Sequence, residues 1–164
     1  MANVRAPLAG ALTALAFLSS PAVQAKPPPS PNLPCQIPGE GAATYLSLDP
    51  LPPAVKKTIA RDFGDWTGHV IDMAPRDADY QESDLIEPGP RLSFHRFIQA
   101  GRAGSRWYIW YESGGEGSRY DFIIYEWRPG SAIAQQVATR SVWQDELCMQ
   151  TLKHWNDPPM KAGG

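Results

Sequence analysis

The sequence predicts an α+β fold: an antiparallel β-meander of about four or five strands, with one helix packed on a face and a C-terminal helix. Three observations predict it. Residues 92–142 contain runs of aromatic and β-branched residues separated by turn residues. Two other segments space their apolar residues as helices do. Of the 164 residues, the 139 that follow residue 25, the end of an expected export signal, are enough for one domain and not for two.

Residues 1–25 have the three parts of an export signal. Arg5 supplies a positive charge, and an apolar run rich in Ala and Leu covers residues 8–18. Val23 and Ala25 put small side chains where a signal peptidase cuts. The apolar run is about half of the roughly 20 residues that a membrane-spanning helix needs. We therefore expect cleavage after Ala25 and a periplasmic or extracellular protein.

Cleavage would leave two cysteines, Cys35 and Cys148. Two cysteines in one small exported domain usually pair, so we expect a Cys35–Cys148 disulfide. Two free thiols are the alternative. A metal site is not expected, because these cysteines lack C-x-x-C spacing.

The charge balance argues against two classes of partner. The chain after residue 25 has 14 basic and 17 acidic residues. Nucleic acids and anionic membranes attract basic surfaces, so neither is an expected partner. No later segment is apolar enough to span a membrane, and the sequence leaves the oligomeric state open.

Proline marks the two ends of the expected domain. Residues 26–34 are proline-rich, and proline fixes φ and removes an amide donor, so we expect an extended linker there. Residues 157–164 resemble it and are expected to form a flexible tail. Residues 35–156 remain as the single α+β domain.

The first helix is expected over residues 51–63. Val55, Ile59 and Phe63 recur at a spacing of four and so lie on one face. Gly64 then ends the helix.

A strand over residues 67–73 and a long loop over residues 74–90 are expected next. The loop carries five acidic residues, which could offer oxygen ligands to calcium. It lacks the glycine and the terminal glutamate spacing of an EF-hand. A solvated acidic loop is the simpler interpretation, so we predict no metal and no cofactor.

Four strands of the meander are predicted from residue types and turns. They cover residues 92–100, 105–112, 119–127 and 134–142. Pairing Glu112 with Arg119 across the second turn gives a plausible register. The face expected to be core then carries Trp107, Ile109, Phe122 and Ile124.

The opposite face of this sheet is also rich in aromatic residues, whereas a half-buried sheet would alternate apolar with polar residues. Aromatic side chains stack on ligands and dominate interfaces. Two helices are few to cover both faces of this sheet, so Tyr108, Trp110 and Tyr125 are expected to be partly accessible. The alternative is that a helix covers this face too. The candidate binding residues are Tyr108, Trp110, Tyr125, Trp127 and His95.

A last helix is expected over residues 145–155, where the apolar residues recur on one face. Cys148 would tie this helix to the N-terminal segment. The residues expected to share one face of this helix are Leu147, Cys148, Thr151, Leu152 and Trp155.

No catalytic constellation is evident. The three histidines are far apart, and no serine lies in G-x-S-x-G. The leading hypothesis is therefore a non-enzymatic exported binding or inhibitor-type module that acts on a protein or an envelope polymer. The alternative is a small hydrolase-type enzyme that uses His95 with a loop carboxylate such as Asp79 or Asp84.

Overall fold

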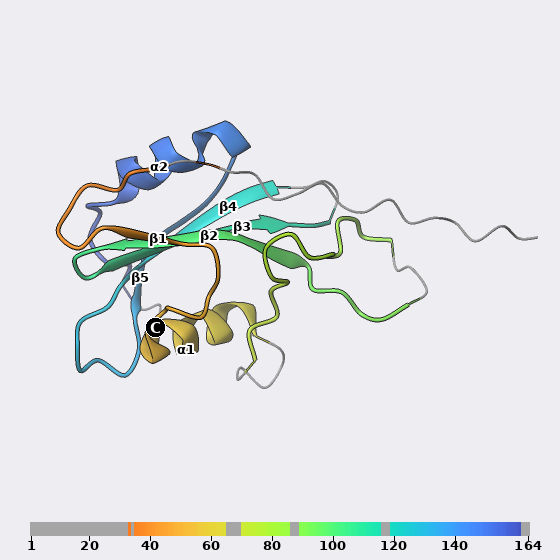
Figure 1. Cartoon of the computed structure of the whole chain (residues 1–164), viewed down its shortest axis with the longest axis horizontal. Helices are drawn as coiled ribbons and strands as arrows, with labels where there is room; N and C mark the ends of the chain where they lie inside the picture. Colours follow the sequence, from red (N-terminus) through yellow and green to blue (C-terminus); the bar gives the residue numbers. More distant parts are fainter. Residues whose placement is uncertain (1–32, 34, 65–69, 86–88, 116–118, 162–164) are drawn as a thin grey trace, which may run out of the picture.

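The computed structural model describes residues 33, 35–64, 70–85, 89–115 and 119–161. Its elements are β1 (Ala43–Tyr45), α1 (Pro53–Phe63), β2 (His95–Ala103), β3 (Arg106–Ser113), β4 (Arg119–Glu126), β5 (Gln135–Val142), the 3-10 turn η1 (Gln144–Glu146) and α2 (Leu147–His154). The five strands form one antiparallel sheet in chain order, with α1 on one face and α2 on the other (Figure 1). The predicted α+β meander is confirmed.

Some expectations fall outside the described residues. The export signal and most of the proline-rich linker lie there. Residues 67–69 of the strand expected over residues 67–73 also lie there. Residues 70–73 are described and form no strand, because Ile71 makes only an isolated bridge to Gly64. The three-residue strand β1 was not predicted, because so short a segment shows no alternation of apolar and polar residues.

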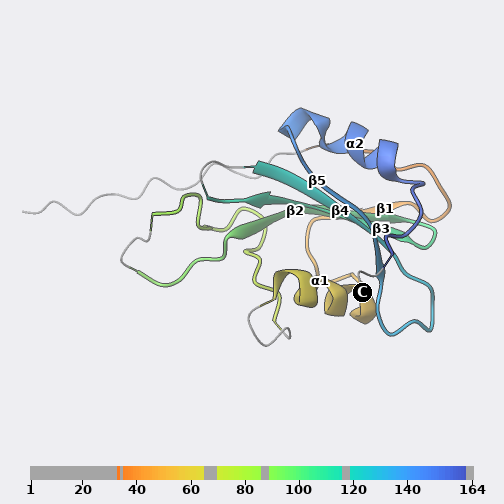
Figure 2. The ribbon, with the colours of Figure 1, turned by 180° about the vertical axis from the view of Figure 1, so that it is seen from behind.

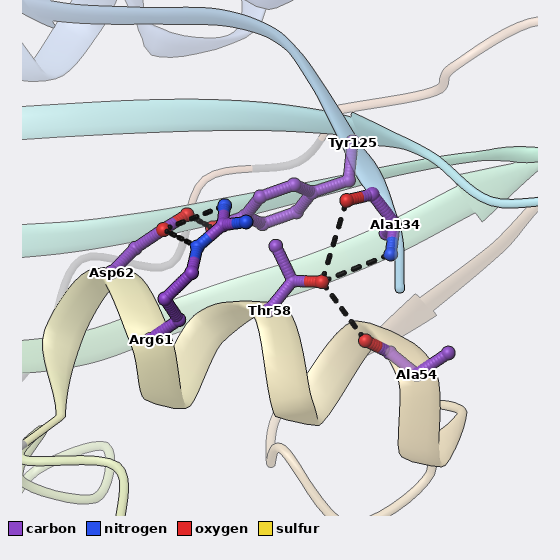
Figure 3. Close-up of polar contacts among 6 residues, drawn as sticks. All are labelled: Ala54, Thr58, Arg61, Asp62, Tyr125 and Ala134. Carbon is purple, nitrogen blue, oxygen red and sulfur yellow. Dashed lines mark hydrogen bonds and ion pairs between the residues drawn. The ribbon is translucent and has the colours of Figure 1, made fainter. Parts of the chain in front are cut away.

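Helix α1 begins and ends close to where its spacing predicts. Val55 and Ile59 are fully buried against the sheet. Figure 3 shows two polar contacts that fix its position across that face. The Ala134 backbone N–H donates to Thr58 Oγ1 at 2.9 Å, and the Tyr125 hydroxyl donates to Asp62 Oδ2 at 2.9 Å.

Each face of the sheet has its own hydrophobic cluster. On the α1 face, buried residues include Leu51, Val55, Ile59, Phe97, Trp107, Ile109, Tyr111, Ile123 and Tyr125. On the α2 face, they include Ile37, Ile98, Tyr108, Trp110, Phe122, Ile124, Leu147 and Trp155. The sheet is therefore the middle layer of three, as the views from the front and from behind both show (Figures 1 and 2).

The register expected between β3 and β4 is wrong by one residue. Arg119 pairs with Ser113, and Glu112 pairs with Tyr120. The Glu112 carboxylate instead binds Arg96 of β2 at 2.5 Å. A one-residue shift moves every side chain of a strand to the other face. The four residues expected to form one core face are all buried, but Trp107 and Ile109 lie on the α1 face while Phe122 and Ile124 lie on the α2 face.

The short helix α2 covers its face with the help of the N-terminal segment. Residues 35–42, orange in Figure 1, lie on the same side of the sheet as α2. The disulfide from Cys35 to Cys148 joins the two, as expected from the sequence. Leu147, Thr151 and Trp155 are buried at a spacing of four, whereas Leu152, which was expected on the same face, lies at its margin and is 38% exposed.

Two backbone carbonyls of the edge strand β5 accept hydrogen bonds from groups outside the sheet ladder. The Met160 backbone N–H donates to the Gln136 carbonyl, and the Arg140 guanidinium donates to the Thr139 carbonyl. A charged side chain and engaged carbonyls discourage the addition of a further strand. Met160 thus lies beside Gln136, near the start of β5.

Removal of the disulfide is expected to destabilise the domain. The bond closes a loop between residues separated by 113 positions, with Cα atoms 5.5 Å apart. Cys148→Ser should lower the free energy of unfolding by about 2–4 kcal/mol, measured by urea denaturation. The unaltered protein after reduction is the control and should be destabilised to a similar extent. Equal stability of oxidised and reduced protein would contradict a structural disulfide.

Candidate functional site

The five candidate binding residues do not share a surface. Tyr108 and Trp110 lie on the α2 face, whereas Tyr125, Trp127 and His95 lie on the α1 side of the sheet. The expected partial exposure of Tyr108, Trp110 and Tyr125 is wrong, since each is 0% exposed. Helix α2 and the disulfide-linked N-terminal segment together cover Tyr108 and Trp110. Tyr125 is covered by α1, where Asp62 accepts a hydrogen bond from its hydroxyl.

The polar atoms of these aromatic residues are satisfied inside the protein. The Gln99 amide donates to the Tyr108 hydroxyl at 2.7 Å, and Trp110 Nε1–H donates to Thr151 Oγ1 at 2.8 Å. Burial raises the pKa of Tyr108 and of Tyr125 above that of free tyrosine. These side chains therefore hold helices on the sheet and offer no free group to a ligand.

His95 is half-buried at the α1 side and belongs to a chain of hydrogen bonds. Its Nδ1 lies 3.1 Å from Ser113 Oγ, and the Ser113 hydroxyl donates to Asp121 Oδ2 at 2.6 Å. Asp121 also accepts a hydrogen bond from Ser141. Burial lowers the pKa of His95 below its usual value, although the negative charges of Asp121 and Asp72 oppose this effect. A neutral ring with its proton on Nδ1 fits the donor position in this chain.

The order of this chain differs from that of a serine hydrolase. In a serine nucleophile site the hydroxyl donates to the histidine, and the histidine donates to the carboxylate. Here the serine lies between the two and directs its proton to Asp121. Ser113 and Asp121 are both buried. The loop carboxylates of Asp79 and Asp84 are exposed, and neither appears among the charges that act on His95.

Among the residues that the structure describes, the most exposed aromatic side chain is Trp143, directly after β5. Trp143 is 77% exposed, which is uncommon for so large an apolar side chain. It lies on the wall of an open cavity of about 640 Å³. We call this cavity the Trp143 hollow. It is lined by Leu33, Tyr120, Trp143, Gln144, Asp145 and Glu146.

Local structure fixes the backbone around the Trp143 hollow. Tyr120 at the start of β4 pairs with Val142, so Trp143 leaves the sheet next to it. The Trp143 backbone N–H donates to Glu146 Oε2 at 3.2 Å, and the Glu146 N–H returns a bond to the Trp143 carbonyl at 3.0 Å. This reciprocal pair closes the turn before α2 in the manner of a capping box. The wall of the hollow is thus anchored to both the sheet and the helix.

The Tyr120 side chain is linked to the core beneath the hollow. Its hydroxyl bonds to Glu112, and burial together with this carboxylate raises the pKa of Tyr120. Glu112 is held in turn by Arg96, whose guanidinium also lies 4.5 Å from the centre of the Tyr80 ring. This buried polar group orients an aromatic side chain that lines the hollow.

Sequence reasoning missed the Trp143 hollow. The sequence does contain an indication of it. Trp143 follows the last expected strand and precedes a polar run that begins a helix, Gln144, Asp145 and Glu146. The contribution of Leu33 had no signal, since it depends on the path that the disulfide imposes on the N-terminal segment.

Comparison with protein-family models, with curated proteins and with solved structures found no match for this chain. Within the described residues, no group of three or more histidine, cysteine and acidic side chains is placed to hold a metal ion. None of the helices in that part of the chain has the length and apolarity needed to cross a membrane.

Proposed function

We propose that this protein is an exported, non-enzymatic binding module that recognises a protein partner through the Trp143 hollow. The observation that carries the proposal is a tryptophan 77% exposed on an anchored turn beside a cavity. Tryptophan is enriched among the residues that dominate binding energy at protein interfaces. A cavity of about 640 Å³ lies within the range of binding pockets, roughly 300–1,000 Å³.

The lining of the hollow specifies the chemistry of the partner. Leu33, Tyr120 and Trp143 supply apolar surface, and Asp145 and Glu146 supply negative charge. Complementary charge favours encounter and sets the register of binding. We therefore expect the partner to insert an apolar side chain that is flanked by lysine or arginine.

The disulfide supports the export part of the proposal, because disulfides persist in oxidising compartments such as the periplasm or the cell exterior. Its place in the core, between α2 and the N-terminal segment, fits a permanent structural role.

The test is retention of a partner from envelope extract on the immobilised mature chain. Trp143→Ala should abolish retention while leaving the fold intact, because the side chain is mostly exposed. Met149→Ala is the matched control, since Met149 is an exposed apolar residue of α2 that does not line the hollow. Retention should also fall as salt is raised through about 0.5 M, because screening weakens the contribution of the acidic rim.

Three outcomes would count against this function. Equal retention by the Trp143→Ala and unaltered chains would place the binding surface elsewhere. Retention that survives protease digestion of the extract would identify a polymer as the ligand. Failure of the unaltered chain to retain anything would remove the basis for a binding module.

A further inference from the structure

The N-terminal segment enters the domain at the hollow itself. Leu33 is one of the lining residues, and the chain then continues to Cys35 and its disulfide with α2. The seven preceding residues, 26–32, have the sequence KPPPSPN. Residues 26–32 are therefore joined, through Asn32, directly to a residue that lines the hollow.

The composition of residues 26–32 matches the lining of the hollow. Proline-rich segments favour the polyproline II conformation and dock on grooves lined by aromatic side chains, at little cost in conformational entropy. Tyr120 and Trp143 provide such a surface. Lys26 and, after the expected cleavage, the new α-amino group carry positive charge, which complements the negative charge of Asp145 and Glu146 in the lining.

The tether makes docking within one molecule favourable. Seven residues in polyproline II conformation span roughly 20 Å, at about 3.1 Å per residue. Because the segment starts from a lining residue, it needs no linker to reach the hollow. A short tether gives an effective concentration in the millimolar range, so even a weak contact is populated.

We propose that residues 26–32 bind in the Trp143 hollow of their own chain and compete there with the protein partner. The competition rests on the proposed function, whereas the docking itself does not. The partner must then displace the segment, and the chemistry that the hollow selects is that of an extended, proline-rich, basic peptide.

The experiment titrates a synthetic peptide of residues 26–34 into three forms of the mature chain. The first form is unaltered. The second carries Pro27→Ser, Pro28→Ser, Pro29→Ser and Pro31→Ser, and the third adds Trp143→Ala to these. Binding is measured by calorimetry, with near-UV circular dichroism to check that each form is folded.

The peptide should bind the second form, and Trp143→Ala in the third form should abolish binding. If the native segment fills the hollow in nine molecules out of ten, the apparent Kd for the unaltered chain is about tenfold weaker than for the second form. Absence of binding to the second form would overturn the proposal. So would equal Kd values for the first two forms, or unchanged binding by the third.

These outcomes are separable from those of the proposed function. Loss of partner retention by Trp143→Ala, together with no binding of the peptide, would keep the function and reject internal docking. If peptide binding depends on Trp143 but partner retention does not, internal docking is kept and the proposed function of the hollow is rejected.

Discussion

Trp110→Ala should lower the free energy of unfolding by about 3–5 kcal/mol, a large part of the stability of a domain of this size. The side chain is 0% exposed and packs between the sheet and α2, where it lies beside Tyr108 at a ring separation of 5.0 Å. Its loss leaves a cavity and removes the donor to Thr151 Oγ1. Urea denaturation with two spectroscopic probes measures the effect and checks for a single transition.

Two control variants test whether both faces of the sheet are covered. Trp107→Ala removes the same side chain from the α1 face, where it is 3% exposed, and should destabilise the domain to a comparable extent. Trp143→Ala should have an effect below about 1 kcal/mol, because most of that side chain is already in water. A Trp110→Ala variant as stable as Trp143→Ala would mean that α2 does not cover its face.

Elements with one apolar face were predictable from the sequence. Helix α1 followed from Val55, Ile59 and Phe63, because only one side of that segment can be buried. The strands of the meander followed from their aromatic and β-branched runs and from the glycines between them. In each case a local pattern carried enough information to place the element.

The register of β3 with β4 was not predictable, because β3 has no alternation. Its segment from Trp107 to Tyr111 is apolar at every position, so a shift of one residue carries no penalty that the sequence reveals. The ion pair chosen to set the register joined the wrong residues. Glu112 finds its partner Arg96 on β2, 16 positions earlier, and that pairing depends on tertiary structure.

The location of the candidate site was hidden for a related reason. Exposed sheet aromatics were expected because the coverage of each face was judged from helices alone. The disulfide adds residues 35–38 to the α2 layer, and the aromatic excess becomes core on both faces. Trp143 is exposed because it lies one residue beyond the end of β5. Its exposure therefore depends on where the strand ends and not on its residue type.

The second large effect is expected from the buried ion pair of Arg96 with Glu112. Arg96 is 1% exposed and Glu112 is 3% exposed. Glu112→Gln keeps the size of the side chain and removes its charge, so the buried Arg96 guanidinium loses the charge of its partner on β3. Removing one partner of a buried ion pair costs about 3–5 kcal/mol, so the free energy of unfolding should fall by that amount.

A double variant distinguishes the charge from the packing. Arg96→Met with Glu112→Leu removes both charges and keeps apolar volume, and should destabilise the domain clearly less than Glu112→Gln alone. Arg128→Gln is the exposed control: it breaks the contact of a 79% exposed arginine with Glu126 and should change stability by no more than about 0.5 kcal/mol. If the double variant were the less stable of the two, the pair would be stabilising in its own right, through the contacts of Arg96 with Tyr80 and of Glu112 with Tyr120.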